Sequence, residues 1–304
     1  MLTEFRQIFI SKAVSTLKMT EKSANRLKIG LIQAKASSNL QENLAKTSKF
    51  VSQAASKGAS IACLQELFAV KYFCQDERKD IFSLAEQVPG KLSTFLSETA
   101  RKHKVTLVGG SIFENEGNKY YNTSLIFDAE GKMIAKYRKI HIPYDPGYYE
   151  QFYFSSGNLG FVQANAGNAR IAPLICYDQW FPEAARVNAI KDAQLIFYPT
   201  AIGWTKEMKQ LEPFSAKRWE DAMRSHASMN GIYAAAVNRV GKEENINFWG
   251  GSFIADPFGE VVARASSTKE EVLVAEIDLS KIHESQEGWG FLRNRKPKSY
   301  GGMI

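Results

Sequence analysis

The sequence predicts an α/β protein in which two β-sheets pack face to face between outer helices. Segments with strand character outnumber helical ones along the 304 residues. They follow the order β-α-β-α-β-β-β twice, which divides the strands between two sheets and leaves helices to cover them. With 44% hydrophobic and 23% charged residues and no Pro/Gly/Ser-rich linker, the chain has the composition of one large core.

The first half of the chain begins with two strand-helix units. Residues 27–34 predict a strand, and residues 39–57 predict an amphipathic helix that stops at Gly58. The short apolar run over residues 61–64 predicts the next strand. The elements that follow are a helix over 92–104 and strands over 105–113, 120–127 and 132–141, the last two joined by the turn residues 128–131.

The second half repeats this alternation and ends in a segment without a pattern. The predicted elements are a strand over 171–177, a helix from Pro182, a strand over 192–200, a helix over 213–230, a strand over 232–238, a hairpin within 249–265 and a strand over 271–278. Residues 291–304 show no apolar period of their own. We expect this segment to cover a sheet edge or to reach a partner subunit.

The stretch from Arg170 to Arg186 places a cysteine between a strand and a helix. Its apolar run ends near Cys176, and Pro182 and Glu183 follow as residues typical of a first helical turn. Oriented N–H groups at such a turn lower the pKa of a thiol, so Cys176 is a candidate nucleophile. On this stretch alone, a small core cysteine is the more common alternative.

Two further candidates, Glu66 and Lys139, stand at strand ends. Glu66 lies at the end of strand 61–64, just after Gln65, where α/β folds place reactive groups, although it could equally cap a loop. Lys139 belongs to strand 132–141, where a lysine is usually solvated, and an inward lysine would require an acidic partner. With Cys176 these residues form a complete set for attack on a carbonyl-type carbon that bears nitrogen.

Residues 142–157 form a connection rich in aromatic and turn residues. Long ordered loops of this kind usually cover a site. The loop contains one glutamate, Glu150.

The composition argues against several other classes of function. Three cysteines are too few for a disulfide framework, which fits a reducing, cytoplasmic location. The four histidines are scattered without metal-ligand spacing, so no bound metal is expected. The net charge of +7 is spread without a dense basic run, so nucleic acid is not an expected partner. No apolar stretch approaches the length of a membrane span, so no membrane association is expected.

Residues 1–26 differ from the rest of the chain. They alternate apolar and basic residues but lack the apolar core and cleavage site of a secretory signal. We interpret them as an N-terminal extension of unassigned function and place the main domain at residues 27–304.

Three motifs around the candidate residues resemble the nitrilase superfamily of carbon–nitrogen hydrolases. They read C-L-Q-E-L-F around Glu66, Y-R-K-I-H-I-P around Lys139 and L-I-C-Y-D-Q-W-F-P-E-A-A-R around Cys176. The resemblance runs from about Leu27 to Tyr300 and keeps the family's motif order. It implies a four-layer αββα sandwich and a Glu-Lys-Cys triad.

The resemblance also implies a role for each matching residue. Glu66 matches the general base, Lys139 the lysine on the oxyanion side and Cys176 the nucleophile. Glu150 matches a second glutamate that holds the lysine and the substrate. Such enzymes hydrolyse C–N bonds of small molecules without a cofactor, and they form homo-oligomers.

Further similarity points to one branch of the superfamily, the N-carbamoylputrescine amidohydrolases of the agmatine route to putrescine. The segments D-P-G-Y-Y-E-Q-F-Y-F, D-Q-W-F-P-E-A-A-R and Y-P-T-A-I-G-W carry this similarity. It implies hydrolysis of a carbamoyl group to putrescine, ammonia and carbon dioxide.

A substrate of that branch ends in a primary ammonium, which carboxylates or aromatic faces would bind. Asp145, Tyr148 and Asp178 are the best candidates, although both aspartates are equally plausible as turn formers. Tyr144 and Tyr177 occupy positions where relatives often have an acidic residue and a tryptophan, which leaves the amine contacts open.

Other substrates and one other class of protein are alternatives. A related amidohydrolase could act on N-carbamoyl-β-alanine, another N-carbamoyl compound or an ω-amide, and an arginine-lined pocket would favour those that carry a carboxylate. A catalytically silent member that serves as an interaction protein is disfavoured, because all three triad positions are filled.

Overall fold

The computed structural model describes residues 25–303, and the fold begins with a sheet built mainly from the first half of the chain. Its spatial order is β16-β1-β2-β3-β5-β4, with β6 also paired to β5. The strands are β1 (Arg26–Gln33), β2 (Ile61–Leu64), β3 (Thr106–Val108), β4 (Ile112–Glu116), β5 (Lys119–Phe127), β6 (Met133–Arg138) and β16 (Glu271–Asp278). The predicted extension, residues 1–26, lies almost wholly outside the described residues.

A second sheet has the order β15-β14-β11-β9-β8-β7, and a small sheet of three strands, β10-β13-β12, lies beside it. The strands of the second sheet are β7 (Ala164–Ala166), β8 (Ala169–Pro173), β9 (Leu195–Thr200), β11 (Tyr233–Asn238), β14 (Phe253–Ala255) and β15 (Val261–Arg264). The small sheet contains β10 (Gly203–Trp204), β12 (Val240–Glu243) and β13 (Ile246–Trp249). The central strands β9 and β11 are buried along their whole length, as expected for parallel strands covered on both faces.

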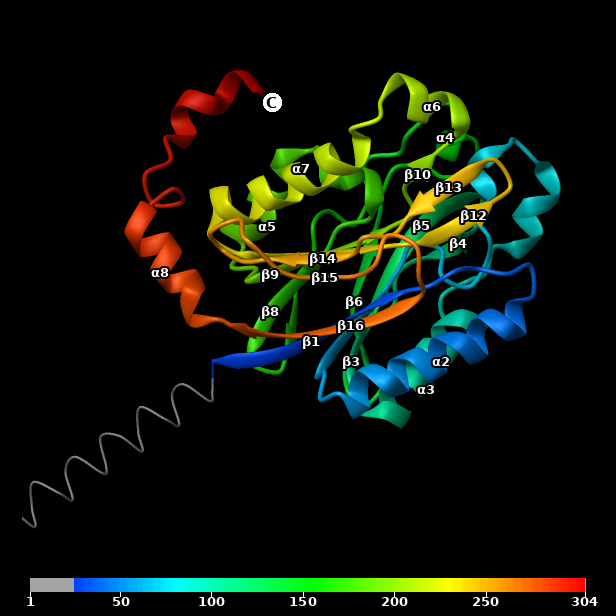
Figure 1. Cartoon of the computed structure of the whole chain (residues 1–304), viewed down its shortest axis with the longest axis horizontal. Coiled ribbons are helices and arrows are strands. Elements are labelled where there is room, and N and C mark those ends of the chain that lie inside the picture. Colours follow the sequence, from blue (N-terminus) through cyan, green and yellow to red (C-terminus); the bar gives the residue numbers. More distant parts are fainter. Residues whose placement is uncertain (1–24, 304) are drawn as a thin grey trace, which may run out of the picture.

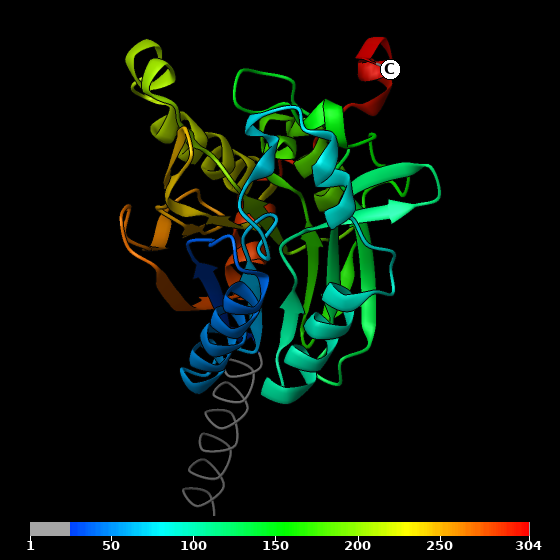
Figure 2. The ribbon, with the colours of Figure 1, turned by 90° about the vertical axis from the view of Figure 1, so that its right-hand side faces the viewer.

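Helices cover the outer face of each sheet (Figures 1 and 2). The first sheet is covered by α2 (Leu40–Ser56) and α3 (Lys91–His103), and the second by α5 (Pro182–Ile190) and α7 (Ser215–Asn230). Shorter elements are α4 (Glu150–Tyr153), α6 (Lys206–Leu211), α8 (Ser280–Trp289) and the 3-10 helices η1 (Phe73–Gln75), η2 (Lys79–Leu84), η3 (Cys176–Trp180) and η4 (Pro297–Met303). The predicted four-layer αββα sandwich is therefore confirmed.

One apolar core lies between the two sheets. Ile29 and Ile61 of the first sheet pack in the same cluster as Ile171, Phe197 and Val237 of the second, and all five are at most 1% exposed. Because this core joins the sheets, residues at the ends of strands in different sheets hold fixed positions relative to one another.

The structure divides the strand predicted over 105–113. Gly110 has a φ of +61°, and a Cβ added there would lie 2.0 Å from the backbone oxygen of Gln65. The chain therefore turns between β3 and β4, pressed against the residue that precedes Glu66. Only glycine fits this close approach.

The candidate residues meet because their strands point the same way. β2 runs parallel to β3, while β6 is antiparallel to β5, which is itself antiparallel to β3. Glu66 and Lys139 thus follow strand ends at one edge of the first sheet. Cys176 follows the carboxyl end of β8 in the second sheet.

Candidate active site

Glu66 is a fully buried carboxylate at the end of β2. Its Oε1 atom accepts hydrogen bonds from Lys139 Nζ at 3.0 Å and Asn122 Nδ2 at 2.8 Å. Within residues 25–303, its Oε2 atom has no hydrogen-bond partner. A buried carboxylate oxygen without a partner is costly, and it is free to accept a proton from an incoming group.

Lys139 lies between two buried glutamates. Its Nζ atom donates to Glu66 Oε1 and, at 2.6 Å, to Glu150 Oε2, and all three side chains are fully buried. The acidic partner that an inward Lys139 requires is therefore present twice. Glu150, the one glutamate of the aromatic loop, begins the short helix α4.

The charges of this cluster determine its protonation. Burial alone would lower the pKa of Lys139, but the carboxylates of Glu150 and Glu66 outweigh burial and raise that pKa well above its ordinary value. Lys139 is therefore a permanent cation at neutral pH. Burial raises the pKa of Glu150 to about 7, opposed by the charge of Lys139.

Two neutral side chains hold the carboxylates in place. Tyr72 donates from its hydroxyl to Glu150 Oε1 at 2.8 Å, and Asn122 donates to Glu66 as described above. Both Tyr72 and Asn122 are buried. Each hydrogen bond therefore occupies one lone pair of a carboxylate and fixes the orientation of that carboxylate.

Cys176 occupies a strained backbone position between β8 and α5. Its φ of +43° lies in the left-handed region, which a residue with a Cβ rarely adopts. The side chain is 5% exposed, and the charges of Glu66 and Lys139 both act on its thiol. The structure therefore places the three candidate residues of the triad together.

The protonation expected for Cys176 is wrong for this structure. We expected N–H groups at a helix start to lower its pKa, but burial, followed by the charge of Glu66, raises that pKa well above the ordinary value. Lys139 and a backbone hydrogen bond from Ala201 lower it by less. Cys176 also begins the 3-10 helix η3, and α5 starts later, at Pro182. The resting side chain is therefore a thiol, and it requires a base at the moment of attack.

Asp178 does not face open space. Its carboxylate accepts hydrogen bonds from the Tyr137 hydroxyl at 2.7 Å and from the backbone N–H of Ile175 at 2.9 Å, and His141 Nδ1 lies 2.7 Å from it. These contacts fix the turn that carries Cys176. Asp178 therefore stabilises this turn, which agrees with its alternative interpretation as a turn former.

Asp145 and Tyr148 pair with each other through their backbones in the aromatic loop. Asp145 is exposed, and its charge acts on Tyr177, the residue after Cys176. The hydroxyl of Tyr148 donates to the backbone oxygen of Gly203 at 3.0 Å and accepts from its N–H. Only the ring of Tyr148, which packs near Tyr72, remains to contact a ligand.

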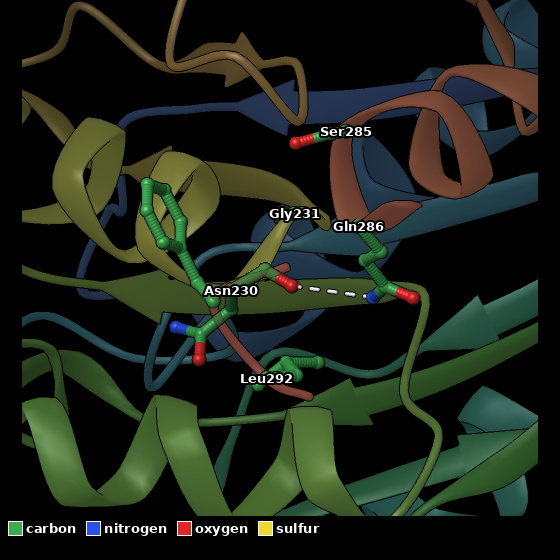
Figure 3. A pocket seen from close by; sticks show the side chains of 6 residues that line it. Asn230, Gly231, Ser285, Gln286 and Leu292 are labelled. Atoms are coloured by element: carbon green, nitrogen blue, oxygen red, sulfur yellow. Dashed lines mark hydrogen bonds between the residues drawn. The ribbon is translucent and has the colours of Figure 1, made fainter. Parts of the chain in front are cut away.

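Two surface hollows lie away from this site. One, shown in Figure 3, lies between Asn230 and Gln286, and a second of about 490 Å³ is lined by Arg170 and Gln194. Arg170 lies at the start of β8, whereas Cys176 follows its other end. Ligands of α/β sheets bind at the carboxyl ends of strands, which favours the Cys176 site.

The described part of the chain has neither a cluster of metal ligands nor a helix that could span a membrane. Across residues 25–303, no three His, Cys, Asp or Glu side chains are placed to hold a metal ion. Over the same range no helix is long and apolar enough to cross a membrane.

Sequence reasoning missed three residues that support the site, namely Tyr72, Asn122 and Arg239. Arg239 is fully buried and donates to the backbone oxygen of Glu66 at 2.9 Å. It directly follows the apolar strand β11, so a charge at a strand end, the signal that singled out Glu66, could have found it. Tyr72 and Asn122 carry no comparable signal.

Comparison with known proteins agrees with this geometry. Residues 28–287 match the carbon–nitrogen hydrolase family. The chain is 40% identical over 295 residues to the N-carbamoylputrescine amidase of Solanum lycopersicum, covering 94% of this chain and 97% of that protein. It is 35% identical over 283 residues to the citrullinase of Francisella tularensis, covering 91% and 98%.

A solved structure extends the comparison to the fold. The carbon–nitrogen hydrolase from Helicobacter pylori superposes with a TM-score of 0.87 at 36% identity, covering 91% of this chain and 98% of that one. The family match and these relatives cover most of the chain. The protein therefore belongs to the carbon–nitrogen hydrolase family of the nitrilase superfamily and is a hydrolase of C–N bonds.

Proposed function

We propose that this protein hydrolyses N-carbamoylputrescine to putrescine, ammonia and carbon dioxide. The observation that carries the proposal is the buried Lys139 held between Glu66 and Glu150 beside Cys176. We assign Cys176 as nucleophile, Glu66 as general base and acid, Lys139 as the oxyanion-stabilising cation and Glu150 as the residue that holds it. The relative from Solanum lycopersicum named above supports the choice of substrate.

The first step forms a bond between Cys176 Sγ and the ureido carbon. Because the resting thiol is protonated, Glu66 accepts its proton as the bond forms, and its unpaired Oε2 atom is available for this. The electron pair of the C=O bond moves onto oxygen, and the ammonium of the buried Lys139 stabilises that charge.

The second step releases the first product. The oxygen returns its electron pair, the C–N bond breaks, and Glu66 gives its proton to the departing nitrogen. A thioester-like adduct then remains on Cys176. Glu66, again a carboxylate, activates a water molecule that attacks the same carbon and frees the thiol. The carbamic acid formed in this way loses carbon dioxide and leaves the remaining amine.

Local charge suits an ammonium at the far end of the substrate. Asp145 is exposed beside Tyr177, and Glu77 accepts a hydrogen bond from Tyr144 in the same loop region. Arg239, by contrast, is already paired with Glu243. We therefore retain Asp145 as the proposed ammonium contact, with the ring of Tyr148 beside the chain of the substrate.

The test is release of ammonia and putrescine from N-carbamoylputrescine, measured beside N-carbamoyl-β-alanine and citrulline. The variant Cys176→Ala serves as the blank. We expect kcat/KM to be at least about tenfold higher for N-carbamoylputrescine, because its ammonium meets Asp145 without a carboxylate to repel. Preference for either carboxylate-bearing compound would reject the substrate and keep the chemistry.

A second candidate substrate is citrulline, since one relative is named a citrullinase. Citrulline carries the same ureido group as N-carbamoylputrescine but adds a carboxylate beside its ammonium. The variant Asp145→Asn separates the two. It should raise KM for N-carbamoylputrescine and should favour citrulline by removing a repulsive charge.

We further propose that this reaction belongs to putrescine biosynthesis by the agmatine route. We also propose that the protein is cytoplasmic and forms a homo-oligomer. Three free cysteines within residues 25–303 suit a reducing compartment. Exposed Trp289 and Phe291, whose rings stack near the C-terminus, offer apolar surface for contact between subunits. Sedimentation of the purified protein tests the assembly.

A further inference from the structure

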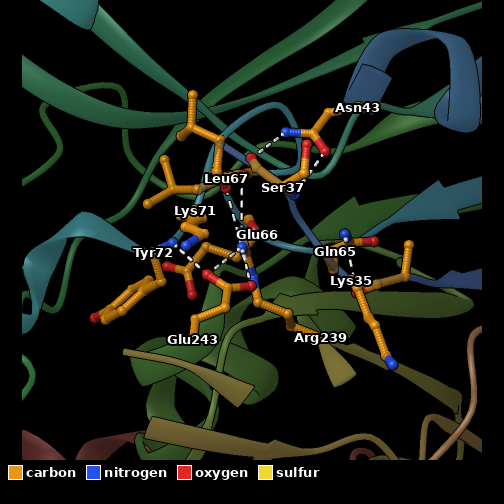
Figure 4. Close-up of polar contacts among 12 residues, drawn as sticks. Lys35, Ser37, Asn43, Gln65, Glu66, Leu67, Lys71, Tyr72, Arg239 and Glu243 are labelled. Atoms are coloured by element: carbon orange, nitrogen blue, oxygen red, sulfur yellow. Dashed lines mark hydrogen bonds and ion pairs between the residues drawn. The ribbon is translucent and has the colours of Figure 1, made fainter. Parts of the chain in front are cut away.

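Arg239 connects the two sheets directly behind the candidate active site. It follows β11 of the second sheet, and its guanidinium reaches the turn that follows β2 of the first sheet (Figure 4). The side chain is fully buried. It therefore links the sheet that carries Cys176 to the residue that we propose as the base.

The guanidinium binds three backbone oxygens of that turn. Its Nη2 atom donates to the backbone oxygens of Glu66 at 2.9 Å and Leu67 at 2.8 Å. Its Nη1 atom donates to the backbone oxygen of Val70 at 3.0 Å and to Glu243 at 2.8 Å. A planar fork of donors suits such an arrangement of carbonyl groups, and an ammonium does not reproduce it.

The turn requires this support because its backbone is strained. Leu67, next to Glu66, has a φ of +47°, a left-handed conformation that a leucine rarely adopts. Its N–H donates to Ser111 Oγ at 2.9 Å, while its oxygen is held by Arg239. Surrounding bonds thus impose the conformation that aims Glu66, as is common where strain persists at a functional site.

The same ion pair also reaches the second glutamate. Glu243, the partner of Arg239, accepts a hydrogen bond from the backbone N–H of Tyr72 at 2.7 Å. The hydroxyl of Tyr72 then donates to Glu150 at 2.8 Å. The pair therefore sets the positions of both carboxylates that hold Lys139.

We propose that Arg239, paired with Glu243, is a positioning residue that holds Glu66 and Glu150 at the separation that the reaction of Cys176 requires. This inference rests on the proposed function for the roles of Glu66 and Cys176. It adds that the base is aimed from the opposite sheet. A shift of about 1 Å in a catalytic group can lower a rate by about 100-fold, so the ion pair has a kinetic effect distinct from its effect on stability.

The experiment measures alkylation of Cys176 by iodoacetamide, which needs no substrate. In this reaction Sγ bonds to carbon, iodide leaves and Glu66 accepts the thiol proton. Peptide mass spectrometry follows the rate at Cys176, with the buried Cys63 and Cys74 as internal references. The variants are Arg239→Lys, Glu243→Gln and Glu66→Gln, with Val51→Ala in α2 as a control for a destabilised core.

We expect Arg239→Lys to slow alkylation of Cys176 at least about tenfold, towards the rate of Glu66→Gln. Glu243→Gln should slow it at least about threefold. Both variants should lower kcat for N-carbamoylputrescine and leave KM within about threefold of wild type, because the pair touches the base and not the substrate. Val51→Ala should lower the melting temperature and leave kcat and alkylation unchanged.

The outcomes separate this inference from the proposed function. Folded Arg239→Lys that is alkylated at the wild-type rate, while Glu66→Gln is slow, would overturn the positioning role. If Arg239→Lys does not fold, Glu243→Gln decides in the same way. An unchanged rate in Glu66→Gln would refute Glu66 as base and the positioning role with it. Wild-type protein that is alkylated but does not turn over N-carbamoylputrescine would reject only the substrate.

Discussion

At the scale of single residues, the site depends on one cation shared by two acids. Lys139 keeps its proton because Glu66 and Glu150 surround it in the absence of solvent. Cys176 keeps its proton because the same burial opposes a thiolate. A lysine in this state can stabilise an oxyanion but cannot serve as a base, which leaves Glu66 for that role.

Removing either charge should therefore impair the chemical step. Lys139→Met removes the cation at similar volume, and Glu66→Gln removes the base. We expect each to lower kcat by about 100-fold to 10,000-fold, since oxyanion stabilisation and general-base catalysis contribute amounts of this order. Steady-state kinetics with N-carbamoylputrescine check this, and a loss of less than about tenfold would move the role to another residue.

The ion pair between Glu150 and Lys139 also predicts how activity depends on pH. Burial raises the pKa of Glu150 to about 7, so this carboxyl gains a proton as the pH falls through 7 and its ion pair with Lys139 is lost. We expect kcat/KM to fall on the acidic side with an apparent pKa near 7 that belongs to the coupled cluster.

Glu150→Gln provides the control for this limb. Glutamine keeps the shape of the side chain and cannot titrate. The variant should be slower at every pH, and its acidic limb should move from about 7 to lower pH. An acidic limb that stays near 7 in the variant would show that another group causes it.

At the scale of elements, the rule that reactive groups follow buried strands found most of the site. Glu66 follows β2, which its short apolar run predicted. Cys176 follows β8, but this strand ends at Pro173 and not at Tyr177 as predicted, because the chain enters the 3-10 helix η3 at Cys176. Glu150 required the resemblance to a family, because it begins a four-residue helix within an aromatic loop. Composition alone does not predict a helix of that length.

The elements that escaped prediction owe their stability to neighbours. Helix α8 buries only Ile282 and Ser285, so its sequence shows little apolar period. The hairpin of β12 and β13 turns at Glu244, which has a φ of +48° and lacks the usual glycine. Tertiary packing, which local sequence does not encode, determines both.

The contact between α7 and β9 makes stability depend on pH. His226 of α7 is 6% exposed and lies 3.0 Å from the Tyr198 hydroxyl of β9. Burial lowers the pKa of His226 to about 4 from its usual 6.5, so the unfolded chain binds more protons between these values. Stability is therefore lost as the pH falls. This side chain should reduce the free energy of unfolding by about 2 kcal/mol between pH 7.5 and 5.

Urea unfolding of wild type and His226→Gln at both pH values measures this contribution. Other titrating groups, including Glu150, act in both proteins and cancel in the difference. We expect the variant to lose about 2 kcal/mol less than wild type on acidification. Equal losses in the two proteins would show that His226 titrates normally.

At the scale of the whole molecule, the two sheets contribute different parts of the site. The first supplies Glu66 and Lys139, the second supplies Cys176, and the shared core fixes their separation. The double β-α-β-α-β-β-β order predicted two sheets between helices, but it did not predict that β16, from the end of the chain, joins the first sheet beside β1. It also could not predict Arg239 as a link between the two sheets, since that contact joins residues far apart in sequence.

The same view predicts that the N-terminal extension is dispensable for catalysis. The first strand begins at Arg26, and the proposed catalytic residues lie between Glu66 and Cys176. Deleting residues 1–18 should leave kcat/KM for N-carbamoylputrescine unchanged within about twofold. Loss of turnover or of soluble protein in the truncated chain would assign the extension a structural role.

The central claim is that Cys176 attacks the carbamoyl carbon of N-carbamoylputrescine, and one measurement tests it most directly. Wild-type protein is mixed with this substrate, quenched rapidly and digested, and the peptide that contains Cys176 is weighed by mass spectrometry. We predict a substrate-derived adduct on Cys176 that forms and decays in step with the release of putrescine. Release of putrescine at the same rate by Cys176→Ala, with Cys176 of the wild type unmodified, would contradict the account.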